Sequence, residues 1–156
     1  QLGFKVYGET ETHYQMENIE NNFLYRYETN IDKTQLINLF KSVGWKTAEY
    51  PNRLYNAIKN SEYVMTVWKN ENLVGLISAI TDGYINVFIT YLLVKPDYQK
   101  KGLGKIMMND FIKKFDGFGR RILTTELDKE EYYKKFGFNI DGIAMFSKDW
   151  KKDLEE

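Results

Sequence analysis

The segment that most constrains what this chain can fold into is residues 94–111, VKPDYQKKGLGKIMMNDF. A long run of β-forming residues, 85–94, leads into it, and a short loop then carries two glycines, Gly102 and Gly104. Apolar residues follow at spacings of three and four, which predicts an amphipathic helix over 103–115 with a broad buried face. A buried strand, a glycine-containing turn and a packed helix in this order are typical of α/β domains.

The rest of the chain supplies further elements around this unit. Aromatic and β-branched residues predict additional strands over 23–28, 63–69, 73–81, 121–127 and 138–146. Residues 70–72, Asn-Glu-Asn, are expected to form the turn of a hairpin. Helices are predicted from Asp32 to Gly44, from Pro51 onwards and over 129–136. The order β, α, α, β, β, β, α, β, α, β predicts an α/β domain with a mixed central sheet flanked by helices.

The length of 156 residues corresponds to a single domain. Residues 23–156 are expected to form it, because the regular patterns begin at Phe23 and no linker divides the chain beyond that residue. Residues 1–22 are polar and show no sustained periodicity. They are therefore predicted to be an N-terminal extension, which is a tail, a tag-like segment or an accessory arm.

The composition excludes several kinds of site. The absence of cysteine rules out disulfides, thiolate zinc sites and a cysteine nucleophile. His13 is the single histidine, so no metal site is expected. With 22 basic and 22 acidic residues the formal charge is zero, which disfavours a globally basic nucleic-acid binder. The sequence shows no membrane-spanning run and no signal peptide, which predicts a cytoplasmic protein that binds neither membrane nor nucleic acid.

The charge is nevertheless distributed unevenly. Residues 95–121 hold eight basic and three acidic side chains, so this segment carries +5 and the other residues together carry −5. Glycines without a Cβ and the free N–H groups of a helix start suit a bound diphosphate. The alternative is that Gly102 and Gly104 only form a tight turn and that the lysines are a solvated face.

The loop and two other segments resemble a known family. Residues 99–104, Gln-Lys-Lys-Gly-Leu-Gly, match the Q/R-x-x-G-x-G/A signature of the GNAT acetyltransferase superfamily. Residues 93–98, Leu-Val-Lys-Pro-Asp-Tyr, match the L-V-x-P-x-Y lead-in, and residues 133–138, Tyr-Lys-Lys-Phe-Gly-Phe, are similar to its Y-x-K-x-G-F segment. The resemblance covers about residues 23–147 and implies the GNAT fold, in which two parallel strands of the sheet splay apart.

The resemblance implies acetyl-CoA as cosubstrate, and the composition already argues against a metal. The cofactor would lie at the splay between strands 85–94 and 121–127. Backbone groups of the first strand would pair with the pantetheine arm and hold the thioester carbonyl, at Leu92, Leu93 and Val94. Backbone amides of the following loop would hold the diphosphate, at Gln99, Lys100, Lys101, Gly102, Leu103, Gly104 and Lys105.

The resemblance also implies direct attack of an amine on the thioester. Tyr133 occupies the position that commonly supplies the acid for the departing thiolate, and Tyr132 beside it is expected to point elsewhere and to be structural. Strand 85–94 carries no acidic side chain, and Tyr91 stands where related proteins often have one. Glu126 is the remaining candidate for the general base, with transfer of the proton to water as the alternative.

The acceptor is expected to be a primary amine on a small molecule. Residues 44–50 carry two large aromatics, Trp45 and Tyr50, that are predicted to line the acceptor site with Tyr91 and Phe146. Packing of Trp45 in the core is the alternative. An amino acid and a protein amine stay open as acceptors, and a homodimer is possible.

A non-catalytic acyl-CoA-binding sensor or interaction module is the rival function, and a nucleic-acid binder using the basic segment is a weaker one.

Overall fold

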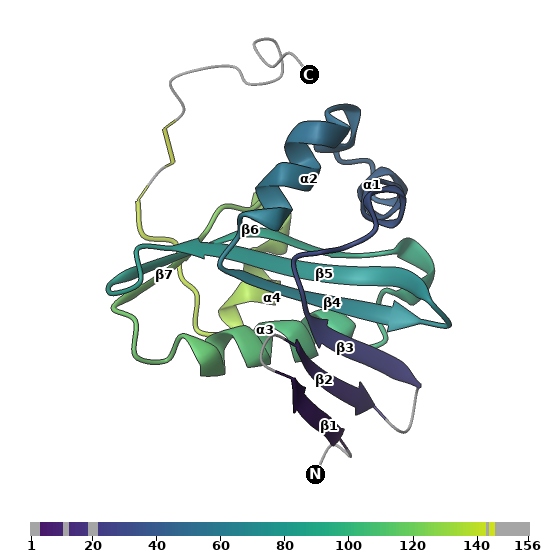
Figure 1. The fold of residues 1–156 in the computed structure, drawn as a ribbon. Coiled ribbons are helices and arrows are strands. Elements are labelled where there is room, and N and C mark those ends of the chain that lie inside the picture. The colour runs from purple at the N-terminus through teal and green to yellow at the C-terminus, as the bar shows by residue number, and fades with distance from the viewer. Residues whose placement is uncertain (1–3, 11–12, 19–21, 143, 146–156) are drawn as a thin grey trace.

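The computed structural model describes residues 4–10, 13–18, 22–142 and 144–145. Seven strands form one sheet in chain order (Figure 1). Neighbouring strands are antiparallel except β6 and β7, which run parallel. The strands are β1 (Phe4–Thr10), β2 (His13–Asn18), β3 (Phe23–Tyr27), β4 (Tyr63–Lys69), β5 (Asn72–Thr81), β6 (Asn86–Val94) and β7 (Arg120–Leu123).

Helices cover both faces of this sheet, as Figure 1 shows. One apolar core lies between the sheet and the first two helices, and a second lies between the sheet and α3. The predicted mixed sheet flanked by helices is therefore confirmed. The helices are α1 (Lys33–Ser42), η1 (Lys46–Glu49), α2 (Pro51–Lys59), η2 (Pro96–Tyr98), α3 (Leu103–Lys114), η3 (Leu127–Lys129) and α4 (Glu130–Lys134), where η denotes a 3-10 helix.

Local signals explain most of these boundaries. The Asp32 carboxylate caps α1 by accepting the backbone N–H of Gln35 at 2.8 Å. Asn70 and Glu71 have positive φ angles of 47° and 63°, which is the backbone of a two-residue type I′ turn between β4 and β5. The predicted hairpin and its turn are thus confirmed.

Helix α3 is tied to the sheet by polar as well as apolar contacts. Its residues Met107, Met108 and Phe111 are fully buried. The Asp110 carboxylate accepts hydrogen bonds from the hydroxyl groups of Tyr63, at 3.0 Å, and Tyr27. Because both tyrosines belong to strands of the sheet, these bonds help to set where α3 lies against it.

Three regions differ from the prediction. The segment predicted as the strand 121–127 is shorter, since β7 ends at Leu123 and η3 follows. The predicted strand 138–146 is wrong over its described residues, where no strand forms. Gly137 and Gly142 have φ angles of 82° and 91°, which interrupt an extended backbone, and Ile140 and Met145 are exposed instead of forming a buried face. Residues 1–22, for which no periodicity was visible, contain β1 and β2, which extend the sheet beyond β3.

The loop between β5 and β6 gives a first testable prediction. The Asp82 carboxylate accepts the backbone N–H groups of Tyr84, Ile85 and Asn86 at 2.8–2.9 Å, and these bonds hold the pKa of Asp82 well below its usual range. A lowered pKa stabilises the fold above the unfolded-state pKa of about 4, and this contribution fades as the pH falls below it. We expect Asp82→Asn to lower the melting temperature by several degrees at pH 7, with the difference shrinking towards pH 2.

Thermal melts of both proteins across this pH range measure the effect. Asp97→Asn removes a charge from another exposed position and serves as the control. A wild-type advantage that stays constant from pH 7 to pH 2 would show that the carboxylate charge does not stabilise the loop.

Candidate functional site

Strands β6 and β7 separate part of the way along their length. They pair from Asn86 with Arg120 to Ile89 with Leu123, and β7 then ends. β6 continues for five residues, 90–94. A bulge lies at this point, because Ser78 and Ala79 of β5 pair with Tyr91 and Ile89 and leave Thr90 without an opposite residue. Bulges bend a strand and increase its twist, so this one directs the end of β6 away from β7.

The separation leaves one edge of β6 without a neighbouring strand in the described structure. The Lys95 N–H donates to the Val74 carbonyl of β5 at 2.8 Å. Backbone groups alternate in direction along a strand, so those of Leu92 and Val94 point to the open edge and those of Leu93 point to β5. The Leu93 side chain is buried under α1 and α2. Of the three predicted residues on this strand, two therefore present backbone groups to the opening.

A side chain anchors the loop that follows to this same edge. The Gln99 side-chain amide donates to the Val94 carbonyl at 2.9 Å. The Val94 carbonyl is thereby engaged, and the loop is held close to the end of β6.

The loop leads directly into α3 and forms a cradle of N–H groups. Lys100 and Gly102 have φ angles of 60° and 83°, in the left-handed region. Among the described residues, no acceptor is found for the backbone N–H groups of residues 102–105, whereas the next one, Ile106, donates to Gly102. Consecutive N–H groups in such a turn, at the positive end of a twelve-residue helix, form an anion-binding concavity. We call residues 99–105 the cradle loop.

The side chains around the cradle loop suit the same ligand. Lys100, Lys101 and Lys105 are exposed, and a Cβ built on Gly102 would meet no atom within 4 Å. The Lys101 ammonium group lies 5.1 Å from the centre of the Tyr98 ring. Free N–H groups, open space and nearby cations together fit the diphosphate of a coenzyme A molecule.

Tyr133 lies on α4, beside the end of β7. Its hydroxyl hydrogen-bonds with Thr125, and its ring packs edge-on against Phe138 with 6.3 Å between the ring centres. Burial raises the pKa of Tyr133, while the Thr125 hydrogen bond and Lys129 lower it, and the net direction is upward. The phenol is therefore protonated at neutral pH and able to donate a proton or a hydrogen bond.

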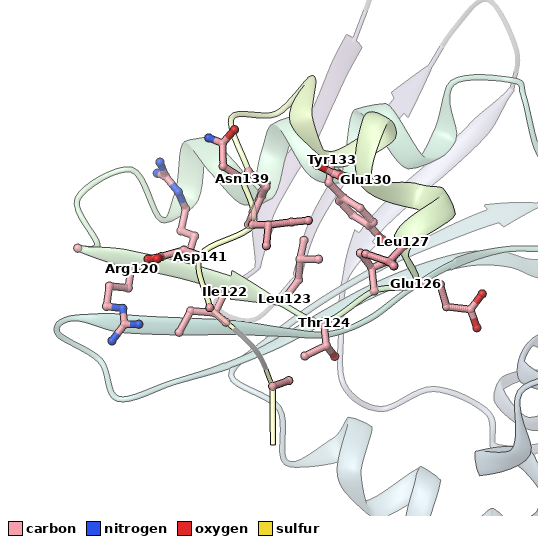
Figure 2. Close-up of a pocket in the computed structure, with 17 residues that line it drawn as sticks. Arg120, Ile122, Leu123, Thr124, Glu126, Leu127, Glu130, Tyr133, Asn139 and Asp141 are labelled. Atoms are coloured by element: carbon pink, nitrogen blue, oxygen red, sulfur yellow. The ribbon is translucent and has the colours of Figure 1, made fainter. Parts of the chain in front are cut away.

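Tyr133 and Glu126 both line a cavity of about 810 Å³ between β7, α4 and residues 138–142 and 144. Figure 2 shows Tyr133 next to Leu127 and Glu130, with Glu126 extending away from them. Glu126 is exposed, and its carbonyl accepts the Lys129 N–H at 3.0 Å. The structure thus brings the two predicted catalytic residues to one cavity, but it directs the carboxylate outwards.

The predicted acceptor residues are only partly brought together. The Trp45 ring lies 5.4 Å from Tyr91 and 5.8 Å from the fully buried Phe40, and it is 37% exposed. Trp45 therefore packs against the core and is also partly exposed. Both alternatives drawn from the sequence, packing in the core and lining the acceptor site, fit this position. Tyr50 is half-buried at the start of α2, and Phe146 lies outside the described residues.

Two hydroxyl groups near the site were missed by sequence reasoning. Thr125 hydrogen-bonds with Tyr133, and the Tyr132 hydroxyl lies against Gly104 at the start of α3. The Tyr132 ring packs edge-on against Tyr133, while its hydroxyl lies beside the cradle loop. Neither contact has a local sequence signal, because each joins segments that meet only in the folded chain.

Other kinds of site find no support among the described residues. No group of three or more metal-ligating side chains comes together there. No helix within the same residues has the length and apolar character that crossing a membrane requires.

Comparisons with known proteins agree with this geometry. The model of the acetyltransferase (GNAT) family matches residues 30–138. An uncharacterized N-acetyltransferase of Porphyra purpurea is 31% identical, over 83% of this chain and 90% of that protein. A histone acetyltransferase of Glycine max is 28% identical, over 77% of this chain and 57% of that protein. A GNAT family structure from Streptococcus pneumoniae superposes with a TM-score of 0.72 at 25% identity, over 81% of this chain and 98% of that one.

Proposed function

The chain belongs to the GNAT acetyltransferase family, and from that premise we propose that it transfers an acetyl group from acetyl-CoA to a primary amine, with a small molecule as acceptor. The observation that supports this best is the open edge of β6 ending at the cradle loop. The open edge of β6 offers backbone groups that no strand of the described residues pairs with, as the edge of a sheet does. The cradle loop next to it offers free N–H groups for a diphosphate.

Acetyl-CoA, when bound, supplies a thioester whose carbonyl carbon forms the new C–N bond as the C–S bond breaks. The open edge at Leu92 and Val94 holds the pantetheine arm in an extended form, as a neighbouring strand would be held. A backbone N–H at this edge stabilises negative charge that develops on the carbonyl oxygen. Positioning and this electrostatic stabilisation are the chain's main contributions to the rate.

Two proton transfers complete the reaction. Tyr133 gives its proton to the departing thiolate, because its phenol is protonated and α4 places it beside the strand ends. The attacking amine must lose a proton, and β6 carries no acid to accept it. The outward direction of Glu126 favours release of this proton to water, and Glu126 is the candidate carboxylate if a side chain takes part.

The lack of an acid on β6 also supports the second candidate, an acyl-CoA-binding sensor or interaction module that does not catalyse transfer. Two measurements separate the acetyltransferase from the sensor. Calorimetry measures coenzyme A binding, and an assay of thiol release from acetyl-CoA measures turnover across a panel of amines. The panel should include small amines, amino acids and lysine-containing peptides. We expect binding together with turnover of at least one small amine. Binding without any turnover favours the second candidate, and no binding contradicts both. A cytoplasmic location and a homodimer stay predictions.

The acceptor assignment rests on the aromatic pair Trp45 and Tyr91. We expect Trp45→Ala to raise the acceptor KM by about fivefold, since it removes one face of an apolar wall worth about 1 kcal/mol to a small ligand. Coenzyme A affinity should not change. The melting temperature should fall only modestly, because more than a third of this side chain is already exposed.

Steady-state kinetics and thermal melts of Trp45→Ala and Trp45→Phe measure these effects. Trp45→Phe keeps an aromatic face and should retain most of the acceptor affinity. A large loss of thermal stability with an unchanged acceptor KM would instead assign Trp45 to the core alone.

A further inference from the structure

The tyrosine next to Tyr133 reaches the other end of the candidate site. A Cβ built on Gly104 would lie 2.8 Å from the hydroxyl oxygen of Tyr132, closer than real Cβ contacts. The next nearest atom is Cζ of the same ring, at 3.8 Å. The Tyr132 hydroxyl therefore occupies the space into which any side chain at position 104 would extend.

Helix geometry places this hydroxyl beside the cradle loop. Gly104 is the second residue of α3, after Leu103. The Cα–Cβ bond of a helical residue tilts towards the N-terminus of its helix. The Tyr132 hydroxyl, 2.8 Å from that Cβ position, thus lies beside the first turn of α3, whose N–H groups have no acceptor among the described residues.

Aromatic packing holds Tyr132 in this direction. Its ring lies edge-on to Tyr133, with 5.1 Å between the ring centres, and 5.2 Å from the ring of Phe136. Burial, with a smaller contribution from Tyr133, raises the pKa of Tyr132 to about 12. The hydroxyl consequently keeps its proton at neutral pH and is available as a donor to an anion.

We propose that Tyr132 is a further cofactor-positioning residue, whose hydroxyl donates a hydrogen bond to the coenzyme A diphosphate on the first turn of α3. This inference rests on the proposed function, because it assigns the diphosphate to the cradle loop. It also explains why position 104 is occupied by glycine here, although the family signature accepts glycine or alanine. The two tyrosines of α4 then serve opposite ends of the pantetheine arm, with Tyr133 at the sulfur and Tyr132 at the diphosphate.

Calorimetry with Tyr132→Phe tests the assignment. This change keeps the ring packing and removes only the hydroxyl. We expect coenzyme A and ADP, which both carry a diphosphate, to lose about fivefold in affinity, as loss of one hydrogen bond predicts. Pantetheine, which lacks the diphosphate, should bind as it does to the wild type. Tyr84→Phe, at an exposed tyrosine in the loop between β5 and β6, is the matched control and should leave the affinity for coenzyme A unchanged.

Each result of this experiment decides something distinct. Unchanged affinity of folded Tyr132→Phe for coenzyme A and ADP overturns the inference and leaves the proposed function intact. An equal loss for coenzyme A and pantetheine also overturns it, since the hydroxyl would then act through the packing of α4. Failure of the wild-type chain to bind coenzyme A overturns the proposed function and the inference together.

A second pair of variants tests the contact without a ligand. Gly104→Ala should lower the melting temperature, because its Cβ meets the Tyr132 hydroxyl. The same change in a Tyr132→Phe background should cost clearly less, since the space is then free. Equal losses in the two backgrounds would show that the hydroxyl does not occupy this position and would overturn the inference.

Discussion

Replacing Gly102 by valine is expected to reduce coenzyme A affinity by tenfold or more, the largest loss of binding that a single change should produce here. Gly102 caps α3 with a φ angle of 83°. A β-branched residue disfavours this left-handed conformation, so the backbone would rotate and the free N–H groups of the cradle loop would no longer converge. In addition, the branched side chain would enter the open space where the diphosphate is proposed to pass.

The matched control for this variant is Gly83→Val. Gly83 has a φ angle of 82°, and a Cβ there likewise meets no atom within 4 Å, but it lies in the loop between β5 and β6. Both variants should lose similar thermal stability from backbone strain, and only Gly102→Val should lose coenzyme A affinity by calorimetry. Wild-type affinity in a folded Gly102→Val protein would remove the cradle loop from the binding site.

Local patterns predicted the parts of the fold that local interactions decide. The two-residue turn at Asn70 and Glu71 and the cap at Asp32 depend on neighbouring backbone groups, and both regions fold as expected. The amphipathic spacing of α3 was equally informative, since buried residues such as Met107 and Phe111 recur on one face. The cradle loop belongs to this group because its shape depends on glycines within a few residues.

The edges of the sheet were harder to predict. β1 and β2 form without a sustained apolar period, because strand pairing satisfies their backbone groups. The segment from Phe138 had enough β-forming residues for a strand, but Gly137, just before it, and Gly142, within it, have positive φ angles. Whether a segment joins a sheet depends on whether a neighbouring strand offers a free edge to pair with. The composition of the segment does not contain that information.

The candidate site shows the same division. Its main-chain part follows from one continuous stretch, 92–105, and was predictable as a unit. The side-chain part combines α4, β7 and the turn after α1, which meet only in three dimensions. The contact of Tyr132 with Gly104 and the outward direction of Glu126 therefore became visible only in the structure.

Replacing Tyr133 by phenylalanine is expected to lower kcat by about a hundredfold, the low end of the range for general acid catalysis, since a thiolate is already a fair leaving group. The ring and its packing remain, so coenzyme A affinity and the melting temperature should stay near the wild-type values. Because burial raises the pKa of Tyr133, its proton is lost only above its ordinary value of about 10. An alkaline fall in kcat caused by Tyr133 should thus lie above pH 10 and be absent from the variant.

Presteady-state thiol release at saturating acetyl-CoA measures this effect where chemistry limits the rate. Tyr132→Phe is the internal control, because saturation compensates for its weaker cofactor binding and its kcat should be close to that of the wild type. Retention of more than about half of kcat by Tyr133→Phe would show that the thiolate takes its proton from water or a backbone group. The raised pKa of Tyr133 would then reflect only the burial of its side chain, without a catalytic role.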